Sequence, residues 1–549
     1  MILLDLKNLS ITPPRSQFVV AGRFPLCFWL ENFVNSEFYG NFAAFMKKVM
    51  TKYCNACLSV LVGIGMFLFW YVWYPHALSY QEQYQLFLWT GDYFVEKISL
   101  PGGFADWVGE FIVQFYYVEW LGALLLAMLF VALQRLTARL LPKAWCLLSL
   151  LPVAVMWWLM GDINVLLSLP VAIVMALALA CIRLPKRLFW LDILIVPVAY
   201  WLIGPAVWIY IVVRVIHLSW KQLWTAGWLV AVQLMVYAWL LPQWPLQQAM
   251  TGLSYYRIPL QYPQWSGYDK DMYELIRLDY LVRNERWDEI VKRAGEYQVK
   301  TPFWCNCVNL ALSQKRLLAD RMFDFYQSGE DALIIPRTRD LTSMLPSAEA
   351  FWRLGMVNSA QRYMFDTQES ILNGKKSGRC TKRIAECMIV NGHYQTARKQ
   401  IELLKKSLFY RSWAEEMEKM IEAETEADQT TPNPSYSGGE NSVFGKLRKM
   451  RYKESFLYSY EEIDKMFGLL LMNNTDNKMA LDYFLAQMLL NGNVQGFQQY
   501  LGAAQQYGGY RQMPLGYQDA MRCIQAQGNV AGSPYANYVK RMMAERRGK

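Results

Sequence analysis

Four acidic side chains lie in the stretch between the first two long apolar runs of the chain, residues 75–115. They are Glu82, Asp92, Asp106 and Glu110. A carboxylate held close to a bound hydroxyl group can accept its proton and act as a general base. Acidic residues on the water-facing side of a surface helix are also common without any catalytic role. The four residues are therefore the first candidates for chemistry, with a solvated acidic helix face as the competing interpretation.

Two further acidic residues lie close to apolar runs. Asp192 is about one turn inside the run 188–213, and Glu119 lies at the edge of an earlier run. An ionisable side chain inside a membrane is costly and is a functional candidate by default. Arg187 is five residues from Asp192, so we expect this acid to be neutralised near the membrane surface. We expect Arg214 to extend to the headgroups on the same side.

The sequence predicts no metal site and no cofactor. Cys54 and Cys57 form a lone CxxC, whereas a zinc site needs a second pair or nearby histidines. There are three histidines, and they are far apart in the sequence. No glycine-rich phosphate loop, Ser-His-Asp arrangement or HExxH motif is present. The net charge is +10, but no basic stripe is interleaved with aromatic residues, which argues against nucleic acid as a partner.

Residues 54–241 form a series of apolar runs broken by basic clusters or Gly/Pro pairs. A helix crosses the hydrocarbon core of a bilayer in about 20 apolar residues. The runs predict about seven spans, over residues 54–74, 116–134, 144–161, 163–182, 188–213 (as two helices that turn at Gly204-Pro205) and 222–241. A single long kinked helix over 188–213 is the alternative, and it would reverse the side on which the chain leaves the membrane.

Basic residues set the expected orientation. Lys47, Lys48 and Lys52 precede the first run, and further Lys and Arg residues fall after alternate runs. Because basic residues resist translocation, we expect the N-terminus and these clusters to be cytoplasmic and the C-terminal region to be outside. The external loop 75–115 has apolar residues at helical spacing on both sides of Pro101-Gly102-Gly103, which predicts two short amphipathic helices, Glu82–Trp89 and Trp107–Phe115.

The chain divides by composition into three parts. Residues 1–45 have no clean signal-peptide pattern and are interpreted as a cytoplasmic arm or an over-extended start. Residues 46–242 form the predicted transmembrane domain, and residues 243–549 a soluble region without any membrane-length run. Within that region, residues 426–441 are rich in Pro, Ser, Thr and Gly, which predicts a mobile loop.

The soluble region has the pattern of paired amphipathic helices. An apolar helix is followed by a turn and then by a second helix, which we expect to begin at Trp287, Arg316, Val357, Tyr394 and Val494. Asn391-Gly392 and Asn491-Gly492 mark two of the turns. Hairpins of this kind stack because each one leaves an apolar face that a neighbour must cover. Tyr394-Gln-Thr-Ala397 resembles the tetratricopeptide class of helical repeat.

Two further resemblances bear on function. The external loop followed by several spans resembles polyprenyl-phosphate-dependent membrane glycosyltransferases, which implies a general base among the four loop acids and a polyprenyl-linked sugar as substrate. The Pro-Gly-Gly loop and Arg411-Ser-Trp413-Ala414 resemble an uncharacterised family of bacterial integral inner-membrane proteins. We therefore expect an all-α, polytopic inner-membrane protein with a tetratricopeptide-like periplasmic domain. The first functional hypothesis is a membrane-anchored scaffold that binds a protein or peptide; a glycosyltransferase is the alternative, and a transporter is disfavoured because the spans carry few charges.

Overall fold

The structure, a computed structural model, describes residues 55–182, 186–217, 220–240, 242, 267–335, 344–371, 376–430, 442–452, 462–528 and 530–547. These residues are helical or irregular, with no strand among them. The chain divides into two compact units, Met1–Leu58 and Ser59–Lys549, and every contact given below lies within the second. The predicted N-terminal arm, residues 1–45, lies outside the described residues.

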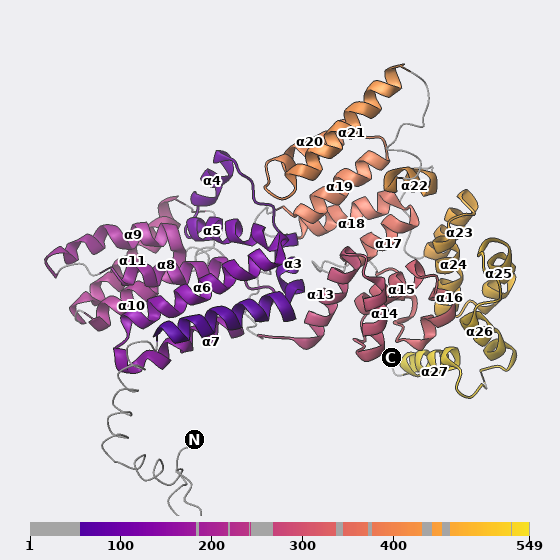
Figure 1. The fold of residues 1–549 in the computed structure, drawn as a ribbon, viewed down its shortest axis with the longest axis horizontal. Coiled ribbons are helices and arrows are strands. Elements are labelled where there is room, and N and C mark those ends of the chain that lie inside the picture. The colour runs from indigo at the N-terminus through magenta and orange to yellow at the C-terminus, as the bar shows by residue number, and fades with distance from the viewer. Residues whose placement is uncertain are drawn as a thin grey trace, which may run out of the picture. The chain divides into compact units, whose positions relative to one another are not determined.

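An apolar block is formed by the described residues within 59–73 and 119–240 (Figure 1). Three of its described helices are long and apolar enough to cross a membrane: Asn55–Trp73, Glu119–Leu140 (α6) and Asp192–Ile216. Shorter apolar helices cover Trp145–Leu159, Ser168–Ala180 and Trp224–Leu240, with 15, 13 and 17 residues. The block contains the labelled elements η1 (Phe69–Trp73), α6, η3 (Lys143–Ser149), α7 (Leu150–Leu159), α8 (Ser168–Ala180), η4 (Lys186–Leu191), α9 (Asp192–Ile203), η5 (Gly204–Ala206), α10 (Val207–His217), η6 (Trp220–Leu223), α11 (Trp224–Met235) and η7 (Val236–Leu240).

The prediction of about seven full-length spans is therefore wrong for the described residues. One reason lies at the start of α8. Asp162 accepts a hydrogen bond from the backbone N–H of Asn164 over 2.9 Å, and the chain continues through turns until Ser168. An apolar run read from sequence includes such turn residues, because a turn between two packed helices can be as apolar as the helices. The helix that results is shorter than the run.

Asp192–Ile216 reaches membrane length only when its parts are counted together, because it folds back on itself between α9, with 12 residues, and α10, with 11. Gly204 has φ +64° and ψ −143°, which ends α9, and Pro205 begins the next turn. Across this turn, Arg214 Nη2 donates to Asp192 Oδ2 over 2.8 Å, and the Tyr210 hydroxyl donates to Asp192 Oδ1 over 2.5 Å. The predicted pair of short helices is thus present. The expectation for Arg214 is wrong: it is buried and paired with Asp192 instead of reaching outward.

The two ends of the apolar block differ in character. At one end, here called the tail end, Trp73, Glu119, Gly161 and Gly204 mark the turns between helices. At the other, the basic end, α6 finishes with Arg135 and Arg139 in its last turns, α10 finishes near Arg214, and η4 begins at Lys186. Ser59 and Ser149 contact Gln134 near the basic end through hydrogen bonds of 2.6 and 2.8 Å.

A connecting segment, residues 74–118, joins the first helix of the block to α6. It contains α3 (Pro75–Gln83), α4 (Gly91–Ile98), α5 (Gly103–Val113) and η2 (Gln114–Tyr117). The Pro101-Gly102-Gly103 break between helices is confirmed, since α4 ends before it and α5 begins within it. The predicted helix Glu82–Trp89 is wrong. Residues 85–89 are irregular, because their backbone groups bond to another part of the chain: Gly378 N–H donates to the Gln85 carbonyl, and Trp89 N–H donates to the Lys406 carbonyl.

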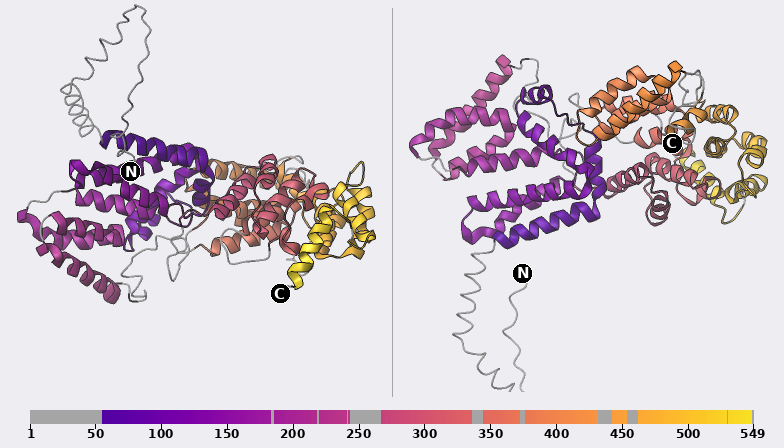
Figure 2. Two further views of the ribbon diagram at one scale, coloured as in Figure 1. Left: turned by 90° about the horizontal axis from the view of Figure 1, so that it is seen from below. Right: turned by 45° about the horizontal axis from the view of Figure 1, so that its top comes forward.

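The tail, residues 267–547, is a succession of helices in which consecutive members pack as pairs (Figures 1 and 2). Helices begin at the predicted residues Trp287, Val357, Tyr394 and Val494, whereas the one expected at Arg316 begins at Leu318. The tail contains α13 (Lys270–Arg283), α14 (Trp287–Glu296), α15 (Pro302–Gln314), α16 (Leu318–Arg321), η8 (Met322–Asp324), η9 (Gly329–Ala332), α17 (Met344–Leu354), α18 (Val357–Glu369), α19 (Gly378–Val390), α20 (Tyr394–Lys405), α21 (Arg411–Thr430), α22 (Val443–Met450), α23 (Ile463–Asn473), α24 (Lys478–Asn491), α25 (Val494–Tyr507), α26 (Leu515–Gln525) and α27 (Pro534–Arg547).

One boundary in the tail differs from its prediction. Helix α21 runs to Thr430, five residues into the segment 426–441 that the sequence predicts to be a loop. Residues 426–430 contain no Pro or Gly, so nothing in them stops a helix, and the first proline follows at Pro432. Residues 431–441 lie outside the described residues.

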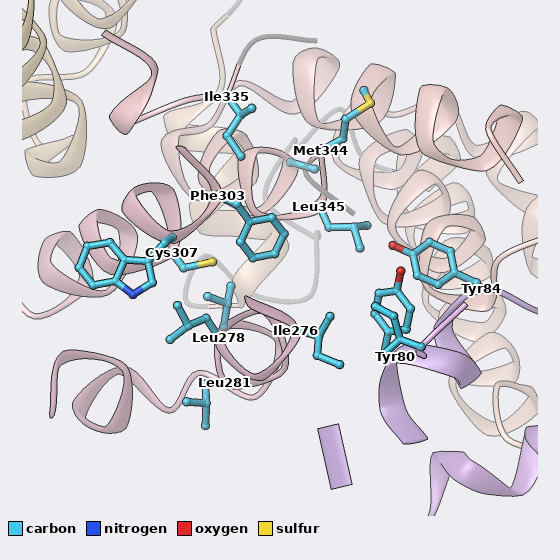
Figure 3. Close-up of a cluster of buried hydrophobic side chains, with 14 of the residues drawn as sticks. Tyr80, Tyr84, Ile276, Leu278, Leu281, Phe303, Cys307, Ile335, Met344 and Leu345 are labelled. Carbon is cyan, nitrogen blue, oxygen red and sulfur yellow. The ribbon is translucent and has the colours of Figure 1, made fainter. Parts of the chain in front are cut away.

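The connecting segment and the tail share one hydrophobic core. Tyr80 and Tyr84, from α3 and its C-terminal cap, are buried in the same cluster as Ile276 of α13 and Leu345 of α17 (Figure 3). Burying aromatic and aliphatic side chains stabilises such an interface by about 1.5–3 kcal/mol for each fully buried side chain. Helix α3 is therefore held between the apolar block and the tail. This packing fixes the position of the polar side chains that α3 presents to the tail.

Candidate functional site: a charged cleft beside the connecting segment

A cleft of about 360 Å³ lies where the connecting segment, the start of α6 and the tail meet. Its lining is unusually rich in charged side chains and tyrosines, and it combines residues from α3, α6, α13, α17 and α19. The lining residues are Ser79, Glu82, Tyr116, Tyr117, Glu119, Tyr280, Arg283, Asn284, Glu349, Arg379, Lys382, Arg383, Glu386 and Tyr410. We call this site the charged cleft.

Of the four acids predicted in the segment 75–115, Glu82 is the one that lines the charged cleft. The residue is buried, with 3% of its surface exposed. Arg283 Nη1 donates to Glu82 Oε2 over 3.3 Å, and the Tyr410 hydroxyl donates to Oε1 over 2.7 Å. Burial alone would lower the pKa of Arg283, but the adjacent Glu82 raises it above its ordinary value. Burial, followed by Glu82, raises the pKa of Tyr410 well above its ordinary value. Glu82 thus joins α3 to two distant parts of the tail.

Arg379, near the start of α19, is the centre of a second buried network. Its guanidinium donates to both oxygens of Asp279, over 2.6 and 3.2 Å, and to Gln83 Oε1 over 2.7 Å. It also lies 3.5 Å from Glu349, to which Arg383 donates twice, over 2.9 and 3.0 Å. Burial would raise the pKa of Glu349, but Arg383 and then Arg379 hold it at about 2. The carboxylate is therefore ionised although it is buried.

Three lining side chains retain binding capacity. Lys382 makes no ion pair with any described residue, and its ammonium lies 5.1 Å from the centre of the Trp413 ring. Glu119 accepts a hydrogen bond from the Tyr280 hydroxyl and has no cationic partner among the described residues. Tyr116 is 1% exposed, and its hydroxyl has no hydrogen-bond partner in the described part of the chain. The remaining ionic side chains of the cleft are paired with one another.

Asp106 and Glu110 lie together in α5, outside the charged cleft. Lys97 of α4 pairs with both, at 3.2 Å and 2.8 Å. The Tyr93 hydroxyl donates to Glu110, and burial, followed by Glu110, raises the pKa of Tyr93 above its ordinary value. Asp92 is exposed in the first turn of α4. The structure therefore separates the four predicted acids into a cleft residue, an ion-paired couple and a surface residue.

The main partners in the charged cleft come from the tail, and the sequence analysis missed them. Arg283 is one of several charged residues on α13, and Glu349 is one of two on α17, so neither stands out in the sequence. The α19 residues carry a detectable signal, since Arg379, Lys382, Arg383 and Glu386 recur at spacings of three and four residues. That spacing places them on one face of a helix. A charged stripe beside an apolar face could have been recognised as a site; its pairing with residues nearly 300 positions earlier could not.

Asp192 and Glu119, the other two acids considered from the sequence, have different surroundings. Asp192 is fully buried and forms an ion pair with Arg214, whereas the side chain of Arg187, the partner expected from the sequence, lies outside the described ones. Glu119 lies in the charged cleft, although no sequence pattern favours it over Asp192 as a site residue. Within the described residues, no group of three or more His, Cys, Asp or Glu side chains has an arrangement that could hold a metal ion.

The sequence pattern of a family of unknown function, DUF6057, matches residues 50–546. The chain belongs to this family. The match extends over the apolar block, the connecting segment and the tail, so it includes every residue of the charged cleft. No curated protein and no solved structure matches the chain. Family membership therefore brings no activity and no site residue to this chain, and function has to be argued from the cleft and its surroundings.

Proposed function

We propose that the protein is a membrane-held scaffold whose helical tail binds a protein or peptide partner on the outer side of a bacterial inner membrane. The apolar block would lie in the bilayer. Large apolar side chains are exposed over its helices, which in water would be unfavourable but in lipid is not. Examples are Leu61, Ile64, Val72, Leu124, Met128, Leu147, Leu151, Leu194 and Val198.

We infer the side of the membrane on which the tail lies from the end of the apolar block that it contacts. Arg277 Nη2 lies 3.4 Å from the Trp73 carbonyl, and the Tyr280 hydroxyl bonds to Glu119, both at the tail end. Arg135, Arg139 and Lys186 are at the opposite end. Because basic ends stay in the cytoplasm, this arrangement favours a tail on the outer, periplasmic side. This argument for the side of the tail does not depend on how many helices cross the membrane fully.

The observation that carries the scaffold proposal is the buried network between the tail and the connecting segment. Glu82, Asp106 and Glu110 are each held by a cation, so their carboxylates fix helices in place. A general base must accept a proton from its substrate, and a cation that is already paired with the carboxylate competes with that proton. A helical tail held rigidly at the membrane surface is what a scaffold requires, and stacked helix pairs of the tetratricopeptide kind provide extended binding surfaces.

A photo-crosslinking experiment in living cells tests partner binding. A photoreactive residue replaces Met472, Leu515 or Met543, which are exposed on α23, α26 and α27. We expect a discrete protein adduct at one or more of these positions and none at Leu61, an exposed position of the apolar block. No protein adduct at any tail position would contradict the scaffold proposal.

The glycosyltransferase alternative is kept because Glu82 lines a polar cleft at the start of a membrane-length helix. In that reading, Glu82 acts as general base on an acceptor of a polyprenyl-linked sugar. The variant Glu82→Gln removes the base, whereas Arg283→Met breaks the same ion pair but keeps the carboxylate. Loss of surface glycan in Glu82→Gln, with glycan retained in Arg283→Met, would favour the enzyme. Equal glycan in both variants and the parent would exclude Glu82 as the base.

A further inference from the structure

The charged cleft is lined by equal numbers of cationic and acidic side chains. Four cationic side chains, Arg283, Arg379, Lys382 and Arg383, face four acidic ones, Glu82, Glu119, Glu349 and Glu386. A polyanion such as a diphosphate would be repelled by the four carboxylates, and a polycation would be repelled by the four cationic side chains. Because complementary charge selects the partner, a balanced cleft favours a ligand that carries one charge of each sign.

Only two of these eight side chains are without an ionic partner among the described residues. Lys382 is free to pair with an anion, and Glu119 is free to pair with a cation, since each of the other six takes part in a protein ion pair. Lysine ammonium groups are common phosphate ligands, and a carboxylate accepts strong hydrogen bonds from an ammonium group. The buried, unpartnered hydroxyl of Tyr116 supplies one more polar group beside them.

The position of the cleft indicates where its ligand comes from. Glu119 is the first residue of α6, a membrane-length helix, and Trp120 beside it is 51% exposed. Exposed tryptophans near helix ends are typical of headgroup depth. Tyr117, which also lines the cleft, is 44% exposed. The cleft therefore opens near the level of lipid headgroups if α6 crosses the membrane, and its volume of about 360 Å³ suits a small group.

We propose that the charged cleft binds a phosphoethanolamine group, with the phosphate on Lys382 and the primary ammonium on Glu119, presented by a phosphatidylethanolamine lipid of the outer leaflet. This site depends on the membrane placement given above but not on the scaffold role. Phosphatidylglycerol lacks the ammonium group. Phosphatidylcholine has the positive charge but no N–H to donate to Glu119. Free phosphoethanolamine has the same polar group without the acyl chains.

The test uses the full-length protein in detergent micelles and counts bound lipid by native mass spectrometry. The probes are the dioctanoyl forms of phosphatidylethanolamine, phosphatidylglycerol and phosphatidylcholine, and free phosphoethanolamine. We expect saturable binding of one phosphatidylethanolamine, at least about tenfold tighter than either other lipid, because only its ammonium group can donate a charge-assisted hydrogen bond to Glu119. Free phosphoethanolamine should compete only weakly; competition as strong as that of the lipid would show a soluble ligand and overturn the lipid source.

Variants separate ligand contacts from folding. Lys382→Met and Glu119→Gln should each weaken phosphatidylethanolamine binding by about tenfold or more. Lys399→Met, at an exposed position of α20, is the matched control and should bind normally. Tyr116→Phe should also weaken binding but leave thermal stability unchanged or raised, since its buried hydroxyl has no partner to lose. Equal binding of all three lipids, or parental binding by both charge variants, would overturn the proposal.

Discussion

Arg214 and Asp192 are separated by 22 residues, yet Arg214 Nη2 lies 2.8 Å from Asp192 Oδ2. In a straight helix that separation would place the two residues about 33 Å apart. Their contact therefore requires the reversal at Gly204-Pro205, and it brings both to the basic end of the apolar block. The Tyr210 hydroxyl completes the carboxylate's set of partners. The ion pair thus holds the start of α9 and the end of α10 next to each other at the basic end of the block.

Breaking this pair from one side should be costly. The variant Arg214→Met leaves Asp192 buried without its cation, and such a change typically costs about 3–5 kcal/mol. The double variant Asp192→Leu/Arg214→Met should recover much of that loss, because neither charge remains. Unfolding of the detergent-solubilised protein measures the effect. Arg139→Met, an exposed residue of α6, is the control, and an equal loss in that variant would show that the ion pair is not the cause.

Gly103 is the tightest point of the connecting segment. A Cβ atom there would lie 1.8 Å from the backbone oxygen of Lys97, which cannot move away as a side-chain tip could. We expect Gly103→Ala to displace α5 from α4 and to reduce sharply the yield of monodisperse protein in size-exclusion chromatography. Gly65→Ala, where nothing lies within 4 Å of the new Cβ, should behave as the parent. Similar yields of the two variants would contradict this packing.

His76 should make the protein sensitive to mild acid. It is 2% exposed at the start of α3, and its Nε2 has no partner within the described residues. Burial, and then Arg277 and Arg293, lower its pKa to about 3. Below the unfolded value of about 6.5, the unfolded chain binds a proton that the folded chain does not, so stability is full above this pH and declines as pH falls.

The expected size of this effect is about 2 kcal/mol between pH 7 and pH 5, from about 1.5 pKa units at 1.36 kcal/mol each. Thermal unfolding at a series of pH values measures it. His76→Phe keeps an aromatic ring beside Tyr74 and Tyr273 and should lose this part of the pH dependence. His393→Phe, at an exposed position, should keep it. An unchanged slope in His76→Phe would refute the role of His76.

Arg379 should determine whether the tail stays docked on the connecting segment. Removing it leaves Asp279 and Glu349 buried with fewer donors and frees Gln83. We expect Arg379→Met to speed hydrogen exchange of the α3 amides and to lower the unfolding temperature. Arg379→Lys should rescue little, because a lysine cannot make the paired contacts to Asp279. Arg362→Met, which breaks a half-exposed pair with Asp366, should cost under about 0.5 kcal/mol. Unchanged α3 exchange in Arg379→Met would contradict this role.

Local signals in the sequence are sufficient to predict where many helices begin, but not to predict the charged cleft. Turn residues before Trp287, Val357, Tyr394 and Val494 are short-range features, and the helices begin at those residues. Hydropathy overestimates the lengths of the apolar helices, since an apolar turn such as the one after Asp162 has the same composition as the helix beside it. Hydropathy does not distinguish the two.

The charged cleft depends on contacts that no local pattern encodes. Glu82 and Arg283 are 201 residues apart, and Glu82 and Tyr410 are 328 apart. The segment 85–89 has helical spacing of its apolar residues, but it stays irregular because its backbone is hydrogen bonded to the tail and Leu86 is buried among α19, α20 and α21. Tertiary contacts here outweigh local propensity, which is weak over so few residues.

A reporter fusion at the C-terminus tests most directly whether the tail lies outside the cytoplasm, on the side opposite the basic clusters. Alkaline phosphatase, which folds only in an oxidising compartment, would be joined after Lys549 in the full-length chain. The contacts of the tail with Trp73 and Glu119 predict high phosphatase activity and protease-accessible residues 267–547 in cells with a permeabilised outer membrane. A second fusion at the same position would carry a reporter that fluoresces only in the cytoplasm. An inactive phosphatase in the first fusion and fluorescence in the second would contradict this arrangement.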